Sequence, residues 1–203
     1  MKDWTGNKKT TFAQLGASNH SDTEREENDF YATDPNTVKI LLNALKRDKL
    51  DLHDTIWECA CGQGHISKVL EPNYKVISTD LVNRGYGGEL DFLSGRIPQE
   101  LKETKFDIIT NPPYKYAQEF VEHSLELLED NCYCIMLLKI QFLEGKARRK
   151  LFSVNPPKYV YVNSERQTCY INGDMSEKMS SASCYCWFIW QKGNKEEPII
   201  RWI

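Results

Sequence analysis

Short apolar runs rich in β-branched and aromatic residues alternate along this chain with segments whose apolar residues recur at helical spacing. The first pattern is typical of buried strands and the second of amphipathic helices. Strands that alternate with helices predict an α/β fold with a mostly parallel sheet and helices on both faces. The last two runs have no helical pattern between them, so we expect an antiparallel last strand. The seven expected strands are residues 56–60, 74–79, a short segment before 91, 106–110, 132–138, 159–162 and 184–190.

The clearest helix signal is Asp34 followed by Pro35. Aspartate caps the free amides of a helix start, and proline fits the first turn. Val38, Leu41 and Leu45 then recur on one face of the expected helix. Further helices are expected near residues 66–70, 116–128 and 146–152.

Composition places the chain among ordinary globular proteins, with 203 residues that are 40% hydrophobic and 27% charged. Residues 1–28 are polar and are predicted to form a flexible tail, and residues 29–203 a single domain. No apolar run is long enough to cross a bilayer, and the first residues form no apolar signal segment, so we expect a cytoplasmic protein. A net charge of −3 offers no general attraction to nucleic acid, and any such binding needs a local basic patch.

The seven cysteines are an odd number in a chain without a secretion signal, which argues against a disulfide framework. Six of them form Cys-x-Cys pairs, at 59 and 61, at 132 and 134, and at 184 and 186. Residues two apart on a strand face the same side, so a metal cluster is one interpretation. All three pairs lie in apolar runs, and we expect buried, reduced thiols and no metal.

The tetrapeptide Asn111-Pro112-Pro113-Tyr114 closes the expected strand at 106–110. Open α/β sheets bind their ligands at the carboxyl ends of strands. Two prolines remove two backbone donors and hold the chain extended, so the corner presents one amide, two carbonyls that no local donor can claim, and an aromatic ring. The amide and a carbonyl can accept the two hydrogens of a planar NH2 group while the ring stacks on its face. A simple proline turn capped by asparagine is the alternative interpretation.

A second motif occupies residues 58–64, between a strand and a helix. Gly62 and Gly64 allow a tight turn and the close approach of a ligand, and the helix start supplies free amides. The motif differs from the Gly-x-Gly-x-x-Gly of dinucleotide enzymes, because the third position falls on Ser67 and the acidic residue comes first.

Acidic residues follow the next two strands as well. Asp80 ends its strand, where its carboxylate can accept both hydroxyls of a ribose. Asp91 and Phe92 follow the third strand, where they can recognise an adenine amine and cover its ring. Each carboxylate alone fits a solvated loop, but their order along the chain, each at a strand end, favours a ligand site.

Together these motifs resemble those of class I S-adenosylmethionine-dependent methyltransferases, most closely DNA adenine methyltransferases of the small phage or prophage type. The glycine loop resembles their Asp/Glu-x-x-x-Gly-x-Gly loop, the tetrapeptide their catalytic motif, and residues 30–35 their N-terminal cofactor motif. The tail at 187–193 and 199–203 is similar to that of small members. The resemblance covers about residues 28–203.

This resemblance implies a Rossmann-like fold, S-adenosylmethionine as methyl donor, adenine in DNA as acceptor, and a bacterial or phage-infected host cytoplasm. The implied catalytic residues are Asn111, Pro112, Pro113 and Tyr114. The implied cofactor-binding residues are Tyr31, Thr33, Pro35, Glu58, Cys59, Ala60, Gly62, Gly64, Asp80, Leu81, Asp91 and Phe92.

The chain departs from the family pattern in two respects. Cys59 and Cys61 replace residue types that are commoner in the glycine loop. There is also no insertion large enough for a separate target-recognition domain, so any sequence specificity must come from the tail or from loops near 139–150 and 163–183.

Residues 139–150 carry the densest positive charge in the chain and follow a strand end on the expected site side. They are therefore candidates for phosphate contacts, with a solvated helix face as the alternative. The predicted nucleic-acid-binding residues are Lys139, Lys146, Arg148, Arg149 and Arg166.

Two other functions stay open at this point. The same chemistry could act on RNA or on the glutamine amide of a protein, since release-factor glutamine methyltransferases share the Asn-Pro-Pro-Tyr corner. A non-catalytic nucleic-acid-binding protein on a methyltransferase scaffold is the other alternative. The oligomeric state, monomer or dimer, is also open.

Overall fold

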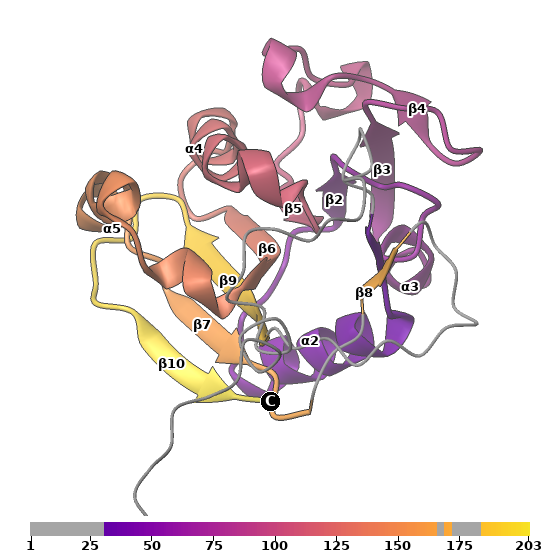
Figure 1. The fold of residues 1–203 in the computed structure, drawn as a ribbon. Coiled ribbons are helices and arrows are strands. Elements are labelled where there is room, and N and C mark those ends of the chain that lie inside the picture. Colours follow the sequence, from indigo (N-terminus) through magenta and orange to yellow (C-terminus); the bar gives the residue numbers. More distant parts are fainter. Residues whose placement is uncertain (1–30, 166–168, 172–183) are drawn as a thin grey trace, which may run out of the picture.

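The computed structural model describes residues 31–165, 169–171 and 184–203 (Figure 1). Eight described strands form one sheet in the order β10-β7-β9-β6-β5-β2-β3-β4. Their bounds are β2 (Thr55–Glu58), β3 (Lys75–Asp80), β4 (Gly88–Glu89), β5 (Asp107–Thr110), β6 (Tyr133–Lys139), β7 (Tyr159–Val162), β9 (Tyr185–Gln191) and β10 (Ile199–Trp202).

The sheet is parallel except at β9, which lies antiparallel between β6 and β7. This confirms the Rossmann-like class and the antiparallel entry of the run after 184. The strand count differs from the prediction, because residues Ile199–Trp202 add an eighth strand, β10, parallel to β7 at the edge of the sheet. All four of its residues are exposed, so the run lacks the burial pattern by which the other strands were predicted.

Both faces of the sheet are buried, and the central strands divide their side chains between them. In β6, Cys134, Met136 and Leu138 contribute to one apolar cluster, and Ile135 and Leu137 to the other. Such two-sided burial is typical of strands covered by helices on both faces.

Four α-helices of the described residues cover the sheet, two on each face (Figure 1). The helices α2 (Pro35–Arg47) and α3 (Ser67–Leu70) pack on one face, and α4 (Ala117–Leu127) and α5 (Arg149–Val154) on the other. As predicted, the side chain of Asp34 caps α2 by accepting a hydrogen bond from the amide of Asn36 at 2.8 Å. None of the described helices is both long and apolar enough to cross a membrane.

A small second sheet joins two segments that are far apart in the sequence. Strand β1 (Tyr31–Thr33) pairs antiparallel with β8 (Cys169–Ile171), which lies between β7 and β9 in the chain. The register places Thr33 opposite Cys169. The segment before α2 is thereby tied to the long connection after β7.

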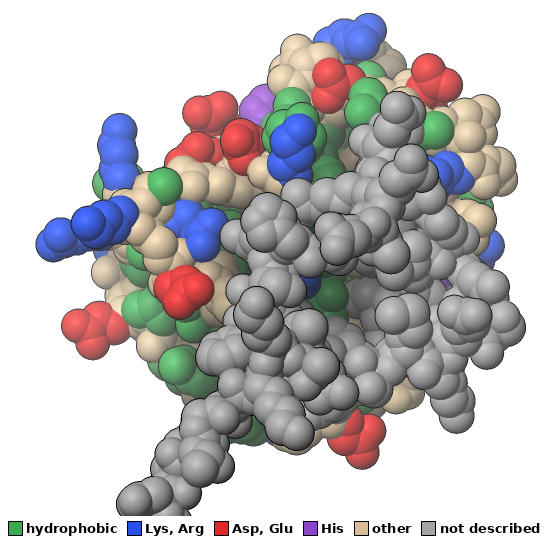
Figure 2. All heavy atoms as spheres, viewed as in Figure 1, with side chains coloured by type: hydrophobic (Ala, Val, Ile, Leu, Met, Phe, Trp, Pro, Cys, Tyr) green, Lys and Arg blue, Asp and Glu red, His purple; other side chains and the backbone are tan. Residues whose placement is uncertain are grey.

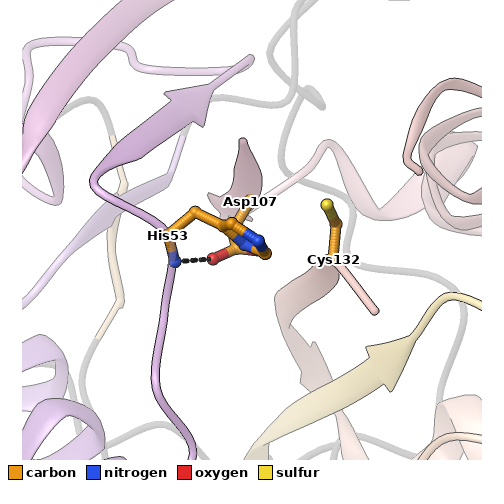
Figure 3. A group of neighbouring side chains, drawn as sticks. All are labelled: His53, Asp107 and Cys132. Atoms are coloured by element: carbon orange, nitrogen blue, oxygen red, sulfur yellow. Dashed lines mark hydrogen bonds and ion pairs between the residues drawn. The ribbon is translucent and has the colours of Figure 1, made fainter. Parts of the chain in front are cut away.

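At the amino-terminal ends of the strands, Asp107 joins three chain segments. Figure 3 shows its contact with His53 and the neighbouring Cys132. Its carboxylate is completely buried and accepts hydrogen bonds from the amides of His53 and Tyr133, both at 2.6 Å, while the His53 ring nitrogen lies 3.1 Å away. Burial raises the pKa of Asp107, and its hydrogen bonds oppose that shift. Cys132 lies close to His53 and Asp107 and completes a group of three side chains. The hydrogen bonds of Asp107 satisfy its buried carboxylate and link the beginnings of the strands, so the group has a structural role.

The cysteines whose side chains are described are free thiols, and five of those six are buried. Burial raises the pKa of both Cys61 and Cys134 to about 12. These thiols therefore stay protonated near neutral pH and pack as small apolar side chains.

Candidate active site

The predicted motifs meet at the carboxyl ends of β5, β2 and β3, which are neighbours in the sheet. The chain runs outward from β2 to β3 and β4, and then returns to β5 and β6 on the other side of β2. The strand order therefore reverses between β2 and β5, where open α/β sheets form a crevice for ligands. The glycine loop follows β2, Asp80 ends β3, and the tetrapeptide follows β5.

The glycine loop after β2 requires glycine at two positions. Gly62 and Gly64 have φ values of +52° and +78°, which side-chain-bearing residues rarely adopt. A Cβ atom at Gly64 would also overlap the ring of Tyr86. The amide of Cys61 donates to the carbonyl of Thr79 at 2.9 Å, so the loop is anchored to β3.

Asp80 lies at the end of β3 with its carboxylate directed at two amides. One oxygen accepts from the amide of Gly62 at 2.8 Å, and the other from the amide of Val82 at 3.0 Å. A carboxylate has about four acceptor positions, so each oxygen keeps one for a further donor. These two acceptor positions, one on each oxygen, match the two hydroxyls of a ribose. Leu81, next in the chain, is 59% exposed and offers an apolar surface beside it.

Glu58 has a different environment from the one expected of a residue on the site surface. Only 1% of it is exposed, and its Oε2 accepts hydrogen bonds from the amide of Ser67 at 2.8 Å and from the Ser67 hydroxyl. Burial raises the pKa of Glu58 to about 8. The side chain thus holds the start of α3 against the end of β2.

Two other predicted cofactor contacts lie in the core. Cys59 and Phe92 are each 2% exposed and belong to the core. The Phe92 ring lies 5.1 Å from that of Trp57 and 4.8 Å from that of Phe120, measured between centroids, so it is already enclosed by protein. The ring of Phe92 thus packs between side chains of β2 and α4.

The surface at this turn is formed by the neighbours of Phe92. Asp91 is exposed and caps the turn by accepting from the amide of Leu93 at 3.0 Å. Leu93 is 37% exposed and was not predicted as a site residue. Two further residues that were predicted to bind the cofactor, Ala60 and Pro35, are partly buried.

Asn111 lies at the carboxyl end of β5, and its side-chain nitrogen donates to the Thr33 hydroxyl at 3.1 Å. The backbone of the corner differs from the prediction in one respect. The amide of Tyr116 donates to the carbonyl of Pro113 at 2.9 Å, so a local donor does claim that carbonyl. In the described part of the chain no hydrogen bond to the Pro112 carbonyl is found.

Tyr114 begins a short 3-10 turn, Tyr114–Tyr116, that leads into α4. Its ring is partly buried and lies 5.9 Å from the ring of Tyr185, at an angle of 34°. The ammonium group of Lys139 lies 5.3 Å from the centre of the Tyr114 ring. Lys139, predicted to bind phosphate, is therefore a neighbour of the predicted stacking residue.

The N-terminal motif reaches the site through Thr33. This residue is 3% exposed and contacts Asn111, whereas the prediction assigned it to cofactor binding. The backbone of Tyr31 forms the start of β1, and its side chain lies outside the described part of the structure.

Basic side chains gather over the end of the molecule where α5 lies (Figure 2). Lys146, Arg149 and Lys150 are exposed. Arg148 is engaged within the protein, since its guanidinium donates to the carbonyls of Glu144 and Gln141. It also lies 4.9 Å from the ring centre of Phe142, so a phosphate contact of Arg148 stays a prediction. Arg166 lies outside the described residues.

Sequence reasoning missed Tyr86, whose ring packs on Gly64 and whose hydroxyl donates to Glu71. The glycines on either side of Tyr86 were the sequence signal that could have drawn attention to this segment. A Cβ atom at Gly87 would lie 2.7 Å from the Ser78 carbonyl, so only glycine lets this segment approach β3 so closely.

Comparison of the sequence with protein-family models and with curated proteins gave no match. The fold, in contrast, is similar to solved structures. A type I restriction-modification system methyltransferase subunit from Streptococcus thermophilus superposes with a TM-score of 0.61 at 14% identity, over 87% of this chain and 48% of its own length. A protein from Listeria monocytogenes assigned as a class I S-adenosylmethionine-dependent methyltransferase gives 0.56 at 12% identity, over 96% of this chain and 71% of its own.

The chain has the class I methyltransferase fold. A dimethyladenosine transferase from Plasmodium falciparum shares it, with a TM-score of 0.52 at 18% identity over 79% of this chain and 62% of its own length. This chain spans about half of the length of the Streptococcus subunit. At these identities the likeness establishes the fold, and any activity has to be argued from the site.

Proposed function

We propose that this protein transfers a methyl group from S-adenosylmethionine to the exocyclic amine of adenine in DNA. The observation that carries the proposal is the arrangement of the motifs where the strand order reverses, between β2 and β5. The Asn-Pro-Pro-Tyr corner at the end of β5 lies beside a glycine loop and the Asp80 carboxylate, at the ends of the adjacent strands β2 and β3.

The residues at the ends of β2 and β3 fit S-adenosylmethionine. Asp80 has one remaining acceptor position on each oxygen for the ribose hydroxyls, and the exposed side chain of Leu81 offers an apolar surface for the adenine. The positive φ values of Gly62 and Gly64 allow the backbone to approach the ligand. When bound, S-adenosylmethionine supplies an electrophilic methyl group.

The corner at the end of β5 suits the acceptor. The exocyclic amine of adenine is a poor nucleophile because its lone pair is delocalised into the ring. Hydrogen bonds from its two hydrogens to the Asn111 side-chain oxygen and the Pro112 carbonyl favour the pyramidal nitrogen that must attack. These bonds strengthen as positive charge develops on the nitrogen, so they stabilise the transition state more than the ground state. Holding both reactants at attack distance supplies further acceleration.

An adenine within a duplex has to leave the base stack before its amine can reach this corner. Flipping costs roughly a few kcal/mol. Stacking of the base on Tyr114 would return about 1–3 kcal/mol of that. The exposed residues Lys146, Arg149 and Lys150 lie beyond the carboxyl end of β6 and are candidates for the phosphate contacts that hold the strand.

The structural neighbours support methylation of a nucleic acid in general terms, since their names include a restriction-modification methyltransferase subunit and a dimethyladenosine transferase. The choice of DNA rests on the sequence resemblance, in particular on residues 30–35. RNA and protein glutamine are therefore included as acceptors in the test.

The test measures transfer of a radiolabelled methyl group from S-adenosylmethionine to DNA, RNA and protein acceptors, with the wild-type protein and Asn111→Ala. We expect label in DNA as N6-methyladenine, and a loss of at least about a hundredfold in kcat for Asn111→Ala with cofactor affinity retained. Label only in RNA or protein would redirect the acceptor assignment. Near-normal turnover by Asn111→Ala would contradict the role of the corner.

A further inference from the structure

The hydroxyl of Thr33 lies against the amide that the proposed reaction uses. Its Oγ1 accepts a hydrogen bond from the side-chain nitrogen of Asn111 at 3.1 Å, although the two residues are 78 positions apart in the sequence. Thr33 is 3% exposed, so its end of the bond is shielded from water. Because the nitrogen faces Thr33, the amide oxygen points in the other direction.

The backbone conformation of Asn111 is already restricted, so only its side-chain conformation has to be fixed. Asn111 precedes Pro112, and a residue before proline is held in an extended conformation. The remaining variables are the two side-chain torsions, and the second of these is broad for asparagine. A hydrogen bond to one end of the amide fixes both the plane of the group and the position of its oxygen.

Thr33 is itself held from both sides. It is the last residue of β1, whose pairing with β8 places it opposite Cys169. It is followed at once by Asp34, the cap of α2, whose side chain accepts from Asn36 at 2.8 Å. A side chain anchored by a strand before it and a helix after it is a suitable support for a catalytic group.

We propose that Thr33 is a positioning residue that sets the orientation of the Asn111 amide for methyl transfer, an inference that rests on the proposed function. In this role Thr33 contacts neither the cofactor nor the acceptor, which distinguishes it from the cofactor-binding role that the N-terminal motif suggested. The pairing of β1 with β8 also makes this support depend on the connection between β7 and β9.

The first test compares Thr33→Val, which keeps the shape and removes the hydroxyl, with Thr33→Ser, which keeps the hydroxyl. We expect Thr33→Val to lower kcat by about five- to tenfold, the equivalent of one hydrogen bond, with the Kd of S-adenosylmethionine changed by less than about twofold. Thr33→Ser should restore most of the lost turnover. Ser124→Ala is the control, because the buried Ser124 hydroxyl donates a hydrogen bond to the Phe120 carbonyl within α4 at 2.7 Å. This change should lower thermal stability and leave kcat within about twofold.

The outcomes separate this inference from the alternatives. An unchanged kcat in Thr33→Val overturns it, and so does a weaker Kd for S-adenosylmethionine with an unchanged kcat, which would restore the cofactor-binding role. A second readout does not depend on turnover, namely the 15N NMR signal of the Asn111 side-chain amide. It should move in Thr33→Val and stay nearly in place in Thr33→Ser. Failure of the wild type to methylate any acceptor would contradict the proposed function. The NMR comparison would then test the contact between Thr33 and Asn111 by itself. An unmoved signal in Thr33→Val overturns the contact, and a moved signal supports it.

Discussion

Replacing Glu58 with glutamine removes an ionisable group from the interior while keeping an oxygen that can accept the hydrogen bonds from Ser67. Burial raises the pKa of Glu58 to about 8, from 4.5 for a free glutamate. Between these two pH values the folded protein holds a proton on Glu58 that the unfolded chain has released. The unfolded state therefore binds fewer protons, and the free energy of unfolding falls as pH rises through this window.

The size of the effect follows from the two pKa values. Each pH unit within the window costs about 1.4 kcal/mol of stability, so raising the pH from about 5.5 to about 7.5 should remove roughly 3 kcal/mol. Glutamine is neutral throughout and does not contribute such a loss. Glu58→Gln should thus resemble the wild type near the acidic end of the window, and should exceed it by roughly 3 kcal/mol near the alkaline end.

Urea unfolding followed by tryptophan fluorescence at several pH values measures this difference. Other groups also titrate, Asp107 with the same sign and Asp48 with the opposite one, but they are common to both proteins and cancel in the comparison. Glu89→Gln, which changes an exposed glutamate, controls for the loss of a negative charge. Parallel pH profiles for the wild type and Glu58→Gln would refute the argument, because they would mean that Glu58 ionises in the folded protein as easily as in the unfolded chain.

Three further changes test the cofactor and nucleic-acid surfaces. Asp80→Ala should raise the Kd of S-adenosylmethionine by about ten- to a hundredfold in calorimetry, since it removes the acceptor for two hydroxyls and loosens Gly62; unchanged affinity would exclude Asp80 as a ligand. Joint replacement of Arg149 and Lys150 by alanine should reduce the slope of DNA affinity against salt by up to about two, at about 0.9 per phosphate contact. Arg148→Ala should leave that slope unchanged and lower the melting temperature, because its guanidinium bonds the carbonyls of Glu144 and Gln141; the reverse result would mean that Arg148 contacts phosphate.

The fold was accessible from the sequence because its elements carry local signals. The Asp34-Pro35 start of α2, the β-branched run of β5 and the strand β7 at residues 159–162 all follow from spacing and residue type, and the structure confirms them. The edge strand β10 was not predicted as part of the sheet. Its residues are exposed, so periodicity, which reports burial, carries little information there.

At the candidate site, the sequence was informative about which strand ends carry chemistry and less so about where each side chain points. Phe92 satisfies the motif by its position, but the space beneath its turn is apolar and the ring packs against Trp57 and Phe120. The contact between Thr33 and Asn111 depends on the pairing of β1 with a strand about 140 residues later. No local pattern encodes such a contact, because tertiary packing alone brings the two side chains together.

The position of Lys139 bears on how a base would enter the site under the proposed function. Its ammonium group lies 5.3 Å from the centre of the Tyr114 ring. A base that stacks on that face of Tyr114 has to displace the ammonium. A cation–π contact at a partly exposed ring is worth about 0.5–1 kcal/mol, and base stacking about 1–3 kcal/mol, so the exchange favours the base. The displaced ammonium remains on a flexible side chain, which can carry it to a phosphate of the bound strand. The ring contact in the free protein and a phosphate contact in the complex are therefore compatible as successive states of one lysine.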